Sequence, residues 1–361
     1  MKAHSLNIIF IKPNKSTFID NDQRILEQFS RVHPFLMQQL QGKLIYGIKN
    51  LQLFFSLLSK IFCKNTIFVC WFADYHAAVM VLAAKFTGKK SVIFVGGQET
   101  ICYPELNKGV YLKKIRGLLV KYALKHTNLI VANHGSLLYH ENHYYNSNQP
   151  HIDGITHYVE KLKTPVEIVF NGIDTSRFIR DKSVQKQQDL ILTVGTMSQK
   201  GDFYNKGFDL FVELAARNPQ LKFVLVGLHE TYKEWFNKEY NPDLIPNLQI
   251  YPYPCPSQEL NQLYNKAKVF VQASITEGMP NTLSEAMLLE CIPVGSNVNG
   301  IPDAIGDTGV IVKNRHVEEL EKAVYTALKM ETATSARERV LTHFSYERRE
   351  QQLHDVFRKY F

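Results

Sequence analysis

Two glutamates in one segment, Glu277 and Glu285, have the residue type and spacing of a ligand site. A strand predicted over 269–272 ends in a loop with Glu277 and Gly278, and an apolar helix is predicted to begin near Asn281. Glycine allows a ligand close to the backbone, and a helix N-terminus attracts anions. Two carboxylates would repel a bare phosphate but suit the hydroxyls of a ribose or sugar attached to one. The segment therefore points to a nucleotide-sugar, with Glu285 in the first helical turn.

The same segment also has an interpretation without a ligand. Thr282 and Glu285 have the spacing of a capping box, and Glu277 can be an ordinary loop acid. Lys206, just ahead of another predicted helix, either supplies a point charge to phosphates or is a solvated loop lysine. In the ligand-binding interpretation, the anion is shared by the backbone of a short stretch, namely Gly278, Met279, Pro280, Asn281 and Thr282.

The segment resembles the Glu-x₇-Glu signature of retaining glycosyltransferases of family 4. Three further stretches resemble that family in the same order, namely 168–178 as its interdomain segment, 191–214 as strand, Gly195, loop, Lys206 and helix, and 221–227 as the next strand. The resemblance extends over about 166–350 and is weaker before that. It implies the GT-B fold, an α/β architecture of two Rossmann-like parallel-sheet domains facing across a cleft. It also implies transfer of a sugar from a nucleotide-sugar to an acceptor hydroxyl, with retention and no metal or other cofactor.

The resemblance also implies roles for individual residues. Glu285 binds the ribose hydroxyls, Glu277 binds the donor sugar, Lys206 binds the diphosphate near Gly195, and Tyr253 stacks on the base. One position departs from the pattern: members commonly carry an arginine directly after the glycine matched to Gly195, and this chain has Thr196 followed by Met197. Lys200, in a predicted loop over 198–205, either replaces that arginine or leaves Lys206 alone at the phosphates.

Two clusters at predicted strand ends are candidates for the acceptor side, because open α/β sheets bind ligands there. In one interpretation, these clusters contact the acceptor or the donor sugar. In the other, Asp74 caps a helix and the glycines form a simple turn. Lys12 and Lys15, after the first predicted strand, are further candidates for contact with a phosphate of donor or acceptor. The candidate residues are Asp74, His76, Gly97, Gln98 and Glu99.

Metal and dinucleotide chemistry are not indicated. Asp20 and Asp22 form an Asp-x-Asp sequence, but they precede a helix predicted over 23–29 and follow no strand directly, so capping is the expected role. Five histidines between His134 and His157 lack cysteine and a helical His-x₃-His pair, so we expect no metal. No Gly-x-Gly-x-x-Gly follows the first strand, which argues against a dinucleotide oxidoreductase.

The net charge of +8 is concentrated in the first part of the chain. Residues 1–160 carry 18 Lys and Arg against 9 Asp and Glu, and 161–361 carry 24 against 25. This asymmetry suggests an anionic partner, either a membrane surface or a phosphorylated acceptor; no nucleic-acid-binding signature accompanies it, so we expect no nucleic acid. Five cysteines without paired spacing and the absence of a signal peptide predict free thiols and a cytoplasmic protein.

Alternating strand and helix patterns predict two parallel-sheet domains, over 1–170 and 171–345. The charged helix over 346–361 crosses back to the first domain in the resembling family. Residues 44–62 form an apolar helix that charges prevent from spanning a bilayer. Its apolar face either packs on the sheet or lies on a membrane surface. That face comprises Leu44, Ile48, Leu51, Phe55, Leu58 and Phe62.

The sequence leaves other functions open. A nucleotide-sugar epimerase or a phosphorylase can use the same fold, and the missing arginine allows a catalytically silent sugar-binding subunit. Neither donor sugar, base nor acceptor follows from the fold. Our expectation is a hexosyltransferase in bacterial-type surface polysaccharide or glycolipid assembly, cytoplasmic or peripheral on the inner face of the cytoplasmic membrane, with a lipid-linked or oligosaccharide acceptor.

Overall fold

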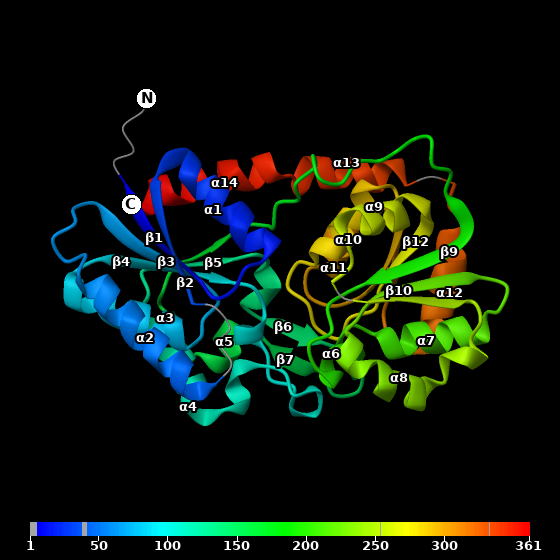
Figure 1. The fold of residues 1–361 in the computed structure, drawn as a ribbon, viewed down its shortest axis with the longest axis horizontal. Coiled ribbons are helices and arrows are strands. Elements are labelled where there is room, and N and C mark those ends of the chain that lie inside the picture. The colour runs from blue at the N-terminus through cyan, green and yellow to red at the C-terminus, as the bar shows by residue number, and fades with distance from the viewer. Residues whose placement is uncertain (1–5, 38–41, 253, 332) are drawn as a thin grey trace. The chain divides into compact units, whose positions relative to one another are not determined.

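The computed structural model describes residues 6–37, 42–252, 254–331 and 333–361. Contacts divide the chain into two compact units (Figure 1). The first contains 1–140, 153–172 and 347–361, and the second contains 141–152 and 173–346. The segment 141–152, which we expected in the first domain, therefore belongs to the second unit.

The sheet of the first unit has six parallel strands in the order β2-β1-β3-β4-β5-β8. The direction of strand addition reverses between β1 and β3, which makes their carboxyl ends a switch point of the sheet. The strands are β1 (Asn7–Lys12), β2 (Arg31–Leu36), β3 (Thr66–Trp71), β4 (Lys90–Val95), β5 (Leu129–Ala132) and β8 (Val166–Ile168).

The helices of the first unit cover both faces of this sheet. Right-handed crossovers place α1 on one face and α2, α3 and α4 on the other, and α14 lies on the face of α1, where Phe29 and Phe357 have ring centroids 5.7 Å apart (Figure 1). The helices are α1 (Thr17–Phe29), α2 (Lys43–Leu58), α3 (Tyr75–Thr87), α4 (Lys114–His126), α5 (Ile155–Tyr158) and α14 (Tyr346–Tyr360). Short 3-10 turns occupy Gln98–Thr100, Pro104–Leu106, Val110–Leu112 and Gly135–Leu137.

Helix α14 is joined to the first unit by a buried ion pair. The Arg349 guanidinium donates to both carboxylate oxygens of Asp22, at 2.6 and 2.7 Å, and the two side chains are 4% and 1% exposed. The Trp71 indole N–H also donates to Asp22, at 2.8 Å. The pair explains why a charged helix from far along the sequence packs beside α1.

The sheet of the second unit has six parallel strands in the order β11-β10-β9-β12-β13-β14. This is the Rossmann order, with its switch point between β9 and β12. The strands are β9 (Gln187–Val194), β10 (Lys222–Leu228), β11 (Leu248–Pro252), β12 (Ala267–Gln272), β13 (Ile292–Ser296) and β14 (Val310–Val312). A separate pair of short strands is formed by β6 (His140–Asn142) and β7 (His151–Asp153).

The helices of the second unit include one that we did not predict. The stretch expected as a loop contains α6, closed by a capping box in which Gln199 and Asp202 satisfy each other's backbone N–H groups. The helices are α6 (Lys200–Asn205), α7 (Phe208–Arg217), α8 (Lys233–Tyr240), α9 (Ser257–Lys266), α10 (Asn281–Leu288), α11 (Ile301–Ile305), α12 (Val317–Leu328) and α13 (Thr334–His343). Short 3-10 turns occupy Glu230–Tyr232 and Pro242–Leu244.

Helix α2 packs with a different face from the one predicted. Leu53 and Leu57 are fully buried in the core of the first unit. Of the six residues of the predicted apolar face, Leu58 is half-buried and the other five are exposed. Of the two interpretations of this face, packing on the sheet is therefore wrong.

Candidate active site

The strongest candidate site lies at the switch point of the second sheet. Strands β9 and β12 are neighbours and parallel, so the segments that follow them, from Gly195 and from Ala273, leave the sheet at the same edge. Open α/β sheets bind ligands in the crevice outside such strand ends. The two residues predicted to be catalytic, Lys206 and Glu277, come together here.

Lys206 and Glu277 form an ion pair. Lys206 Nζ lies 2.5 Å from Glu277 Oε2, and the two side chains are 21% and 19% exposed. Gly195 lies against the stem of this lysine, since a Cβ added there would be 3.4 Å from Lys206 Cγ. The predicted cation and the predicted sugar-binding carboxylate are therefore in contact, a link that the sequence did not reveal.

The turn before α7 fixes Lys206 beside the loop that follows β12. Gly207 has a φ of +70°, and a Cβ there would lie 2.2 Å from the carbonyl oxygen of Ala273, so only glycine fits. The backbone N–H of Ile275 donates to the carbonyl of Asn205 at 2.7 Å. The Asn205 amide donates to the carbonyl of Thr276 at 3.3 Å. Asn205 and Gly207, the sequence neighbours of Lys206, thus both contact this loop and hold Lys206 beside it.

Residues far along the sequence hold the same loop from other sides. The buried Asn142 amide donates to the carbonyl of Ile275 at 2.7 Å. Asn299 Oδ1 accepts the backbone N–H of Glu277 at 3.0 Å, and the N–H of Gly300 donates to the carbonyl of Gly278 at 3.0 Å. We predicted none of these supports, although an Asn-Gly pair after a strand is a turn signal that marks Asn299.

Helix α10 begins at Asn281, and the capping-box interpretation is wrong. The N-cap position is Pro280, and the Thr282 hydroxyl donates instead to Gln272 Oε1 at 3.2 Å. Glu285 is consequently the fifth helical residue, beyond the first turn in which we expected it. The backbone of the segment from Gly278, including the buried Met279, leads into this helix start.

Glu285 accepts a hydrogen bond from a tyrosine of the neighbouring helix α9. The Tyr264 hydroxyl donates to Glu285 Oε2 at 3.1 Å. Burial raises the pKa of the Glu285 carboxyl to about 7, while the Tyr264 hydrogen bond and the Arg177 charge lower it. The carboxyl of Glu285 thus changes charge near neutral pH, where it can act as acceptor or donor toward ligand hydroxyls.

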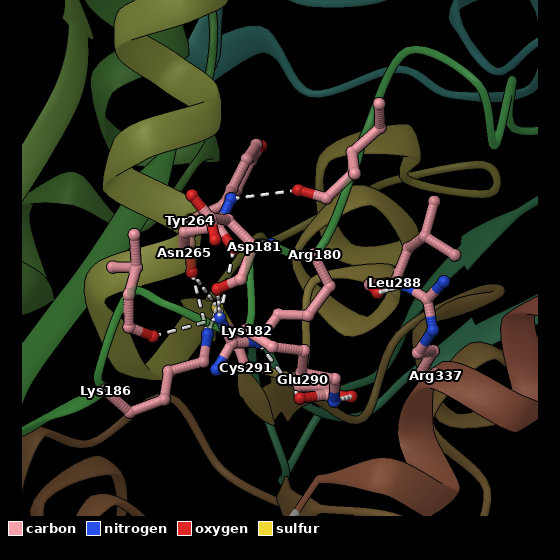
Figure 2. Close-up of polar contacts among 12 residues, drawn as sticks. Arg180, Asp181, Lys182, Lys186, Tyr264, Asn265, Leu288, Glu290, Cys291 and Arg337 are labelled. Atoms are coloured by element: carbon pink, nitrogen blue, oxygen red, sulfur yellow. Dashed lines mark hydrogen bonds and ion pairs between the residues drawn. The ribbon is translucent and has the colours of Figure 1, made fainter.

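A network of polar contacts surrounds the backbone of Tyr264 and the side chain of Asn265 (Figure 2). Lys186 Nζ donates to the Tyr264 carbonyl at 2.8 Å, and the Cys291 thiol donates to the same oxygen at 3.2 Å. Asn265 Oδ1 accepts the backbone N–H of Asp181 at 2.9 Å. This network positions the partner of Glu285. Sequence reasoning missed it because its members are separated by 27 to 84 positions.

The remaining predicted donor-side residues lie as follows. Thr196 is exposed and Met197 is buried in the segment after β9. Lys200 Nζ lies 5.1 Å from the centroid of the Trp235 ring, a cation–π contact with α8. Tyr253 lies outside the described residues. Both candidate cations therefore contact another side chain, Lys200 the Trp235 ring and Lys206 the Glu277 carboxylate.

In the first unit, Asp74 and His76 both have structural partners. Asp74 accepts the backbone N–H of Tyr75 at 2.8 Å at the start of α3 and forms a two-pronged pair with Arg116, with Nε–Oδ1 at 2.9 Å. His76 Nε2 lies 2.9 Å from the carbonyl oxygen of Trp71. Burial lowers the pKa of His76. The Asp74 contact is the helix-cap role that we weighed against acceptor contact, and the buried His76 contact is a structural role that we did not consider.

Glu99 lies fully buried in a cradle of backbone N–H groups. Glu99 Oε1 accepts from Gly96 at 3.1 Å and from Ala73 at 3.5 Å, and Oε2 accepts from Gly97 at 3.2 Å. Burial raises the pKa of its carboxyl to about 7. Gln98 Oε1 accepts the N–H of Gly109 at 3.3 Å. The cradle ties together the carboxyl ends of β3 and β4.

The segment beside this cradle is strained. Phe72 has a φ of +63°, a conformation that costs a bulky residue on the order of 1–3 kcal/mol and is most frequent at functional sites. A Cβ at Gly96 would lie 2.5 Å from the Phe72 ring. The strained Phe72 and the buried Glu99 carboxyl therefore lie at the same edge of the first sheet.

The Asp-x-Asp sequence is divided between two partners. Asp20 is paired with Lys12, which also donates to Gln23 at 2.9 Å, and Asp22 holds Arg349. Lys15 is exposed. Among the described residues, no three His, Cys, Asp or Glu side chains gather as a metal site would require.

A cavity of about 550 Å³ lies in the first unit, at the amino ends of β1 and β3 and beside the end of α14. Its lining includes Phe29, Thr66, Lys90 and Arg358. No predicted site residue lines it.

Residues 174–342 match the family described as "Glycosyl transferases group 1". This range includes Lys206, Glu277 and Glu285. A phosphatidylinositol N-acetylglucosaminyltransferase component from Arabidopsis thaliana is 24% identical over 172 residues. That alignment covers 46% of this chain and 37% of the Arabidopsis protein.

Two solved structures are similar over nearly the whole chain. Sucrose-phosphate synthase from Thermosynechococcus elongatus has a TM-score of 0.76 at 14% identity, covering 98% of both chains. HepE of Anabaena in complex with UDP-glucose has a TM-score of 0.69 at 15% identity, covering 98% of this chain and 100% of HepE. The predicted α/β fold of two Rossmann-like domains is confirmed, and the family match supports a glycosyltransferase.

Proposed function

We propose that this protein is a retaining, metal-independent glycosyltransferase that moves a sugar from a nucleotide-sugar to an acceptor hydroxyl. One observation carries the proposal. A lysine and a glutamate, Lys206 and Glu277, are in contact at the switch point of the second sheet, inside the range that matches the glycosyltransferase family. A cation for the leaving phosphates and an acceptor for sugar hydroxyls thus lie side by side.

The binding roles follow from the chemistry of each group. Lys206, with the backbone N–H groups at the start of α10, neutralises the charge that develops on the departing nucleoside diphosphate. Glu285 accepts ribose hydroxyls while Tyr264 orients its carboxylate. Glu277 accepts hydroxyls of the donor sugar. Because HepE was solved with UDP-glucose, UDP-sugars are the first donors to test.

The ion pair has a consequence for the reaction. A bound diphosphate competes with Glu277 for the same ammonium group, so binding moves Lys206 toward the phosphates and releases Glu277 for the sugar. We infer attack on the same face as the leaving group, with the departing phosphate accepting the proton of the acceptor hydroxyl. No protein base and no metal enter this scheme.

We further propose a cytoplasmic setting in glycolipid or surface polysaccharide assembly, with a lipid-linked or oligosaccharide acceptor at the inner face of the membrane. The excess of basic residues in the first part of the chain supports anionic surroundings. The Arabidopsis relative, whose name includes phosphatidylinositol, supports a lipid acceptor.

A panel of nucleoside diphosphates in a thermal-shift assay tests the donor site. A ligand at 100 times its dissociation constant adds about 2.7 kcal/mol of stability, and we expect one diphosphate to stand out. Release of diphosphate from the matching nucleotide-sugar should then require an acceptor. Turnover without an acceptor would indicate an epimerase, and tight binding without turnover on any acceptor would indicate a silent sugar-binding protein.

A further inference from the structure

The first unit exposes a stripe of large apolar side chains along α2. The exposed fractions are 78% for Leu44, 48% for Ile48, 59% for Leu51 and 65% for Phe55. Their spacing places them on one side of the helix. Phe62, in the segment after α2, is 92% exposed. A helix that already buries Leu53 and Leu57 therefore has a second apolar face without a protein partner within the described chain.

The stripe continues onto the two neighbouring helices. Helix α2 packs on α3, and α3 packs on α4, on the same face of the first sheet (Figure 1). The rings of Phe54 and Phe86 have centroids 6.2 Å apart, which joins α2 to α3. We call the exposed large apolar residues of the three helices, with Phe62, the α2–α4 surface: Leu44, Ile45, Ile48, Leu51, Phe55, Phe62, Leu82, Phe86, Ile115 and Leu118.

The charges around this surface have a single sign. Between Glu27 and Glu99 the sequence contains one acidic residue, Asp74, and Arg116 neutralises it. No acidic residue lies between Glu105 and Glu141. The three helices and their ends carry lysines instead, including Lys49, Lys60, Lys64, Lys85, Lys89, Lys90, Lys114, Lys121 and Lys125.

This combination selects one kind of partner. Exposed Leu, Ile and Phe flanked by lysines is the composition of helices that lie in the membrane interface, where anionic lipid headgroups attract the ammonium groups. A second copy of the chain is a poorer partner, because a symmetric contact would bring the lysines of both copies together. Within the described chain, no helix is long and apolar enough to cross a bilayer.

We propose that the α2–α4 surface binds the surface of an anionic phospholipid bilayer, with α2 lying in the plane of the interface. The apolar residues insert among the acyl chains near the headgroups, and the lysines contact the headgroup phosphates. This inference deepens the proposed function, since it names the surface on which a lipid-linked acceptor is met, and it rests on that function only for its biological role.

Vesicle co-sedimentation of the full chain, without donor or acceptor, tests the inference. The vesicles are phosphatidylcholine alone and phosphatidylcholine mixed with phosphatidylglycerol as the anionic arm, each at low and high salt. We expect binding to the anionic vesicles only, weakened by salt. Replacing two lysines, Lys49→Gln with Lys60→Gln, should lower the partition coefficient by roughly tenfold or more.

Exposed residues provide matched variants that leave the fold intact. Phe55→Ser with Phe62→Ser should lower binding to anionic vesicles by about tenfold or more, on the order expected for loss of two buried apolar side chains. Leu244→Ser is the control, because Leu244 is 75% exposed in the second unit, and it should bind as the unmodified protein does. Nucleoside-diphosphate affinity should be unchanged in all of these variants.

Three results would overturn the inference: equal binding to both vesicle types, binding that the paired substitutions do not change, or a dimer in light scattering that Phe55→Ser abolishes. The last would assign the surface to a second copy. Loss of vesicle binding with nucleotide binding intact would refute the membrane surface alone. If the unmodified protein binds the anionic vesicles but no nucleoside diphosphate, the proposed function alone is refuted.

Discussion

Replacing Glu277 by glutamine should tighten the binding of a free nucleoside diphosphate while it slows sugar transfer. In the unmodified protein, Lys206 is held by Glu277 at 2.5 Å, so a diphosphate must first compete for this cation. The Glu277→Gln substitution removes both the competing carboxylate and its repulsion of the phosphates. It also removes the charged acceptor that we assign to the sugar, which free diphosphate lacks.

The expected size of the effect follows from the exposure of the pair. Opposite unit charges about 4 Å apart attract by about 4 kcal/mol at an effective dielectric constant of about 20, and fully exposed pairs contribute about 0–1 kcal/mol. With side chains that are 21% and 19% exposed, we expect about 1–2 kcal/mol, or roughly 5- to 30-fold in diphosphate affinity. Transfer should slow roughly 10- to 100-fold, as for loss of a hydrogen bond to a charged group worth about 1.5–3 kcal/mol.

Titration calorimetry with nucleoside diphosphates, and turnover measured with the nucleotide-sugar, give the two readings. Asp189→Asn is the control, because Asp189 pairs with Lys222 at 3.0 Å near the amino end of β9, about 20 Å from Gly195 by the length of a strand. It should leave affinity unchanged. Unchanged or weaker diphosphate binding in Glu277→Gln would refute the argument that the pair restrains Lys206.

Four further outcomes are expected. Lys206→Ala and Glu285→Ala should each weaken diphosphate binding about tenfold or more, as for one lost charge-assisted hydrogen bond; normal calorimetric affinity in both would place the donor elsewhere. Activity should survive excess chelator, since lysine and a helix N-terminus supply the positive charge, whereas loss that magnesium restores would reopen a metal role. Folding raises the pKa of Glu99 from 4.5 to about 7, so the folded state holds a proton that the unfolded chain releases. This protonation stabilises the folded state by up to about 3 kcal/mol. The stabilisation is fully present below about pH 4.5 and is lost as pH rises through about 7. Glu99→Gln should flatten that slope in chemical denaturation, and an unchanged slope would contradict it. Asp22→Asn should cost about 3–5 kcal/mol of unfolding free energy because it leaves Arg349 buried without a counter-charge, while Asp20→Asn, at a side chain that is 50% exposed, should cost about 1 kcal/mol or less; equal costs would refute the distinction.

The sequence predicted the parallel sheets and the loop between β12 and α10 because both depend on local patterns. Apolar strand runs identify β9 and β12, and glycine and proline mark the segment from Gly278 to the start of α10. The contacts that complete the site depend on strand order, which local patterns do not contain. Tyr264 reaches Glu285 across 21 positions, and Asn142 reaches Ile275 across 133.

Helix α2 shows a different limit. Periodicity reveals that a helix has an apolar face, but it does not say which neighbour that face meets. Leu53 and Leu57 lie on the face that packs against the core, while the more regular stripe through Leu51 and Phe55 remains exposed. A helix with two apolar faces needs two partners, and the part of the chain that the structure describes supplies only one of them.

The buried pair between Asp22 and Arg349 also bears on how the protein is made. The two residues are 327 positions apart, and at about 5–20 residues per second a ribosome takes roughly 16–65 s to travel between them. During that interval the growing chain contains Asp22, whose carboxylate is buried in the folded first unit, but not yet Arg349, whose guanidinium neutralises it. We therefore expect the first unit to complete its folding only after helix α14 has been made, although its first strand is made first.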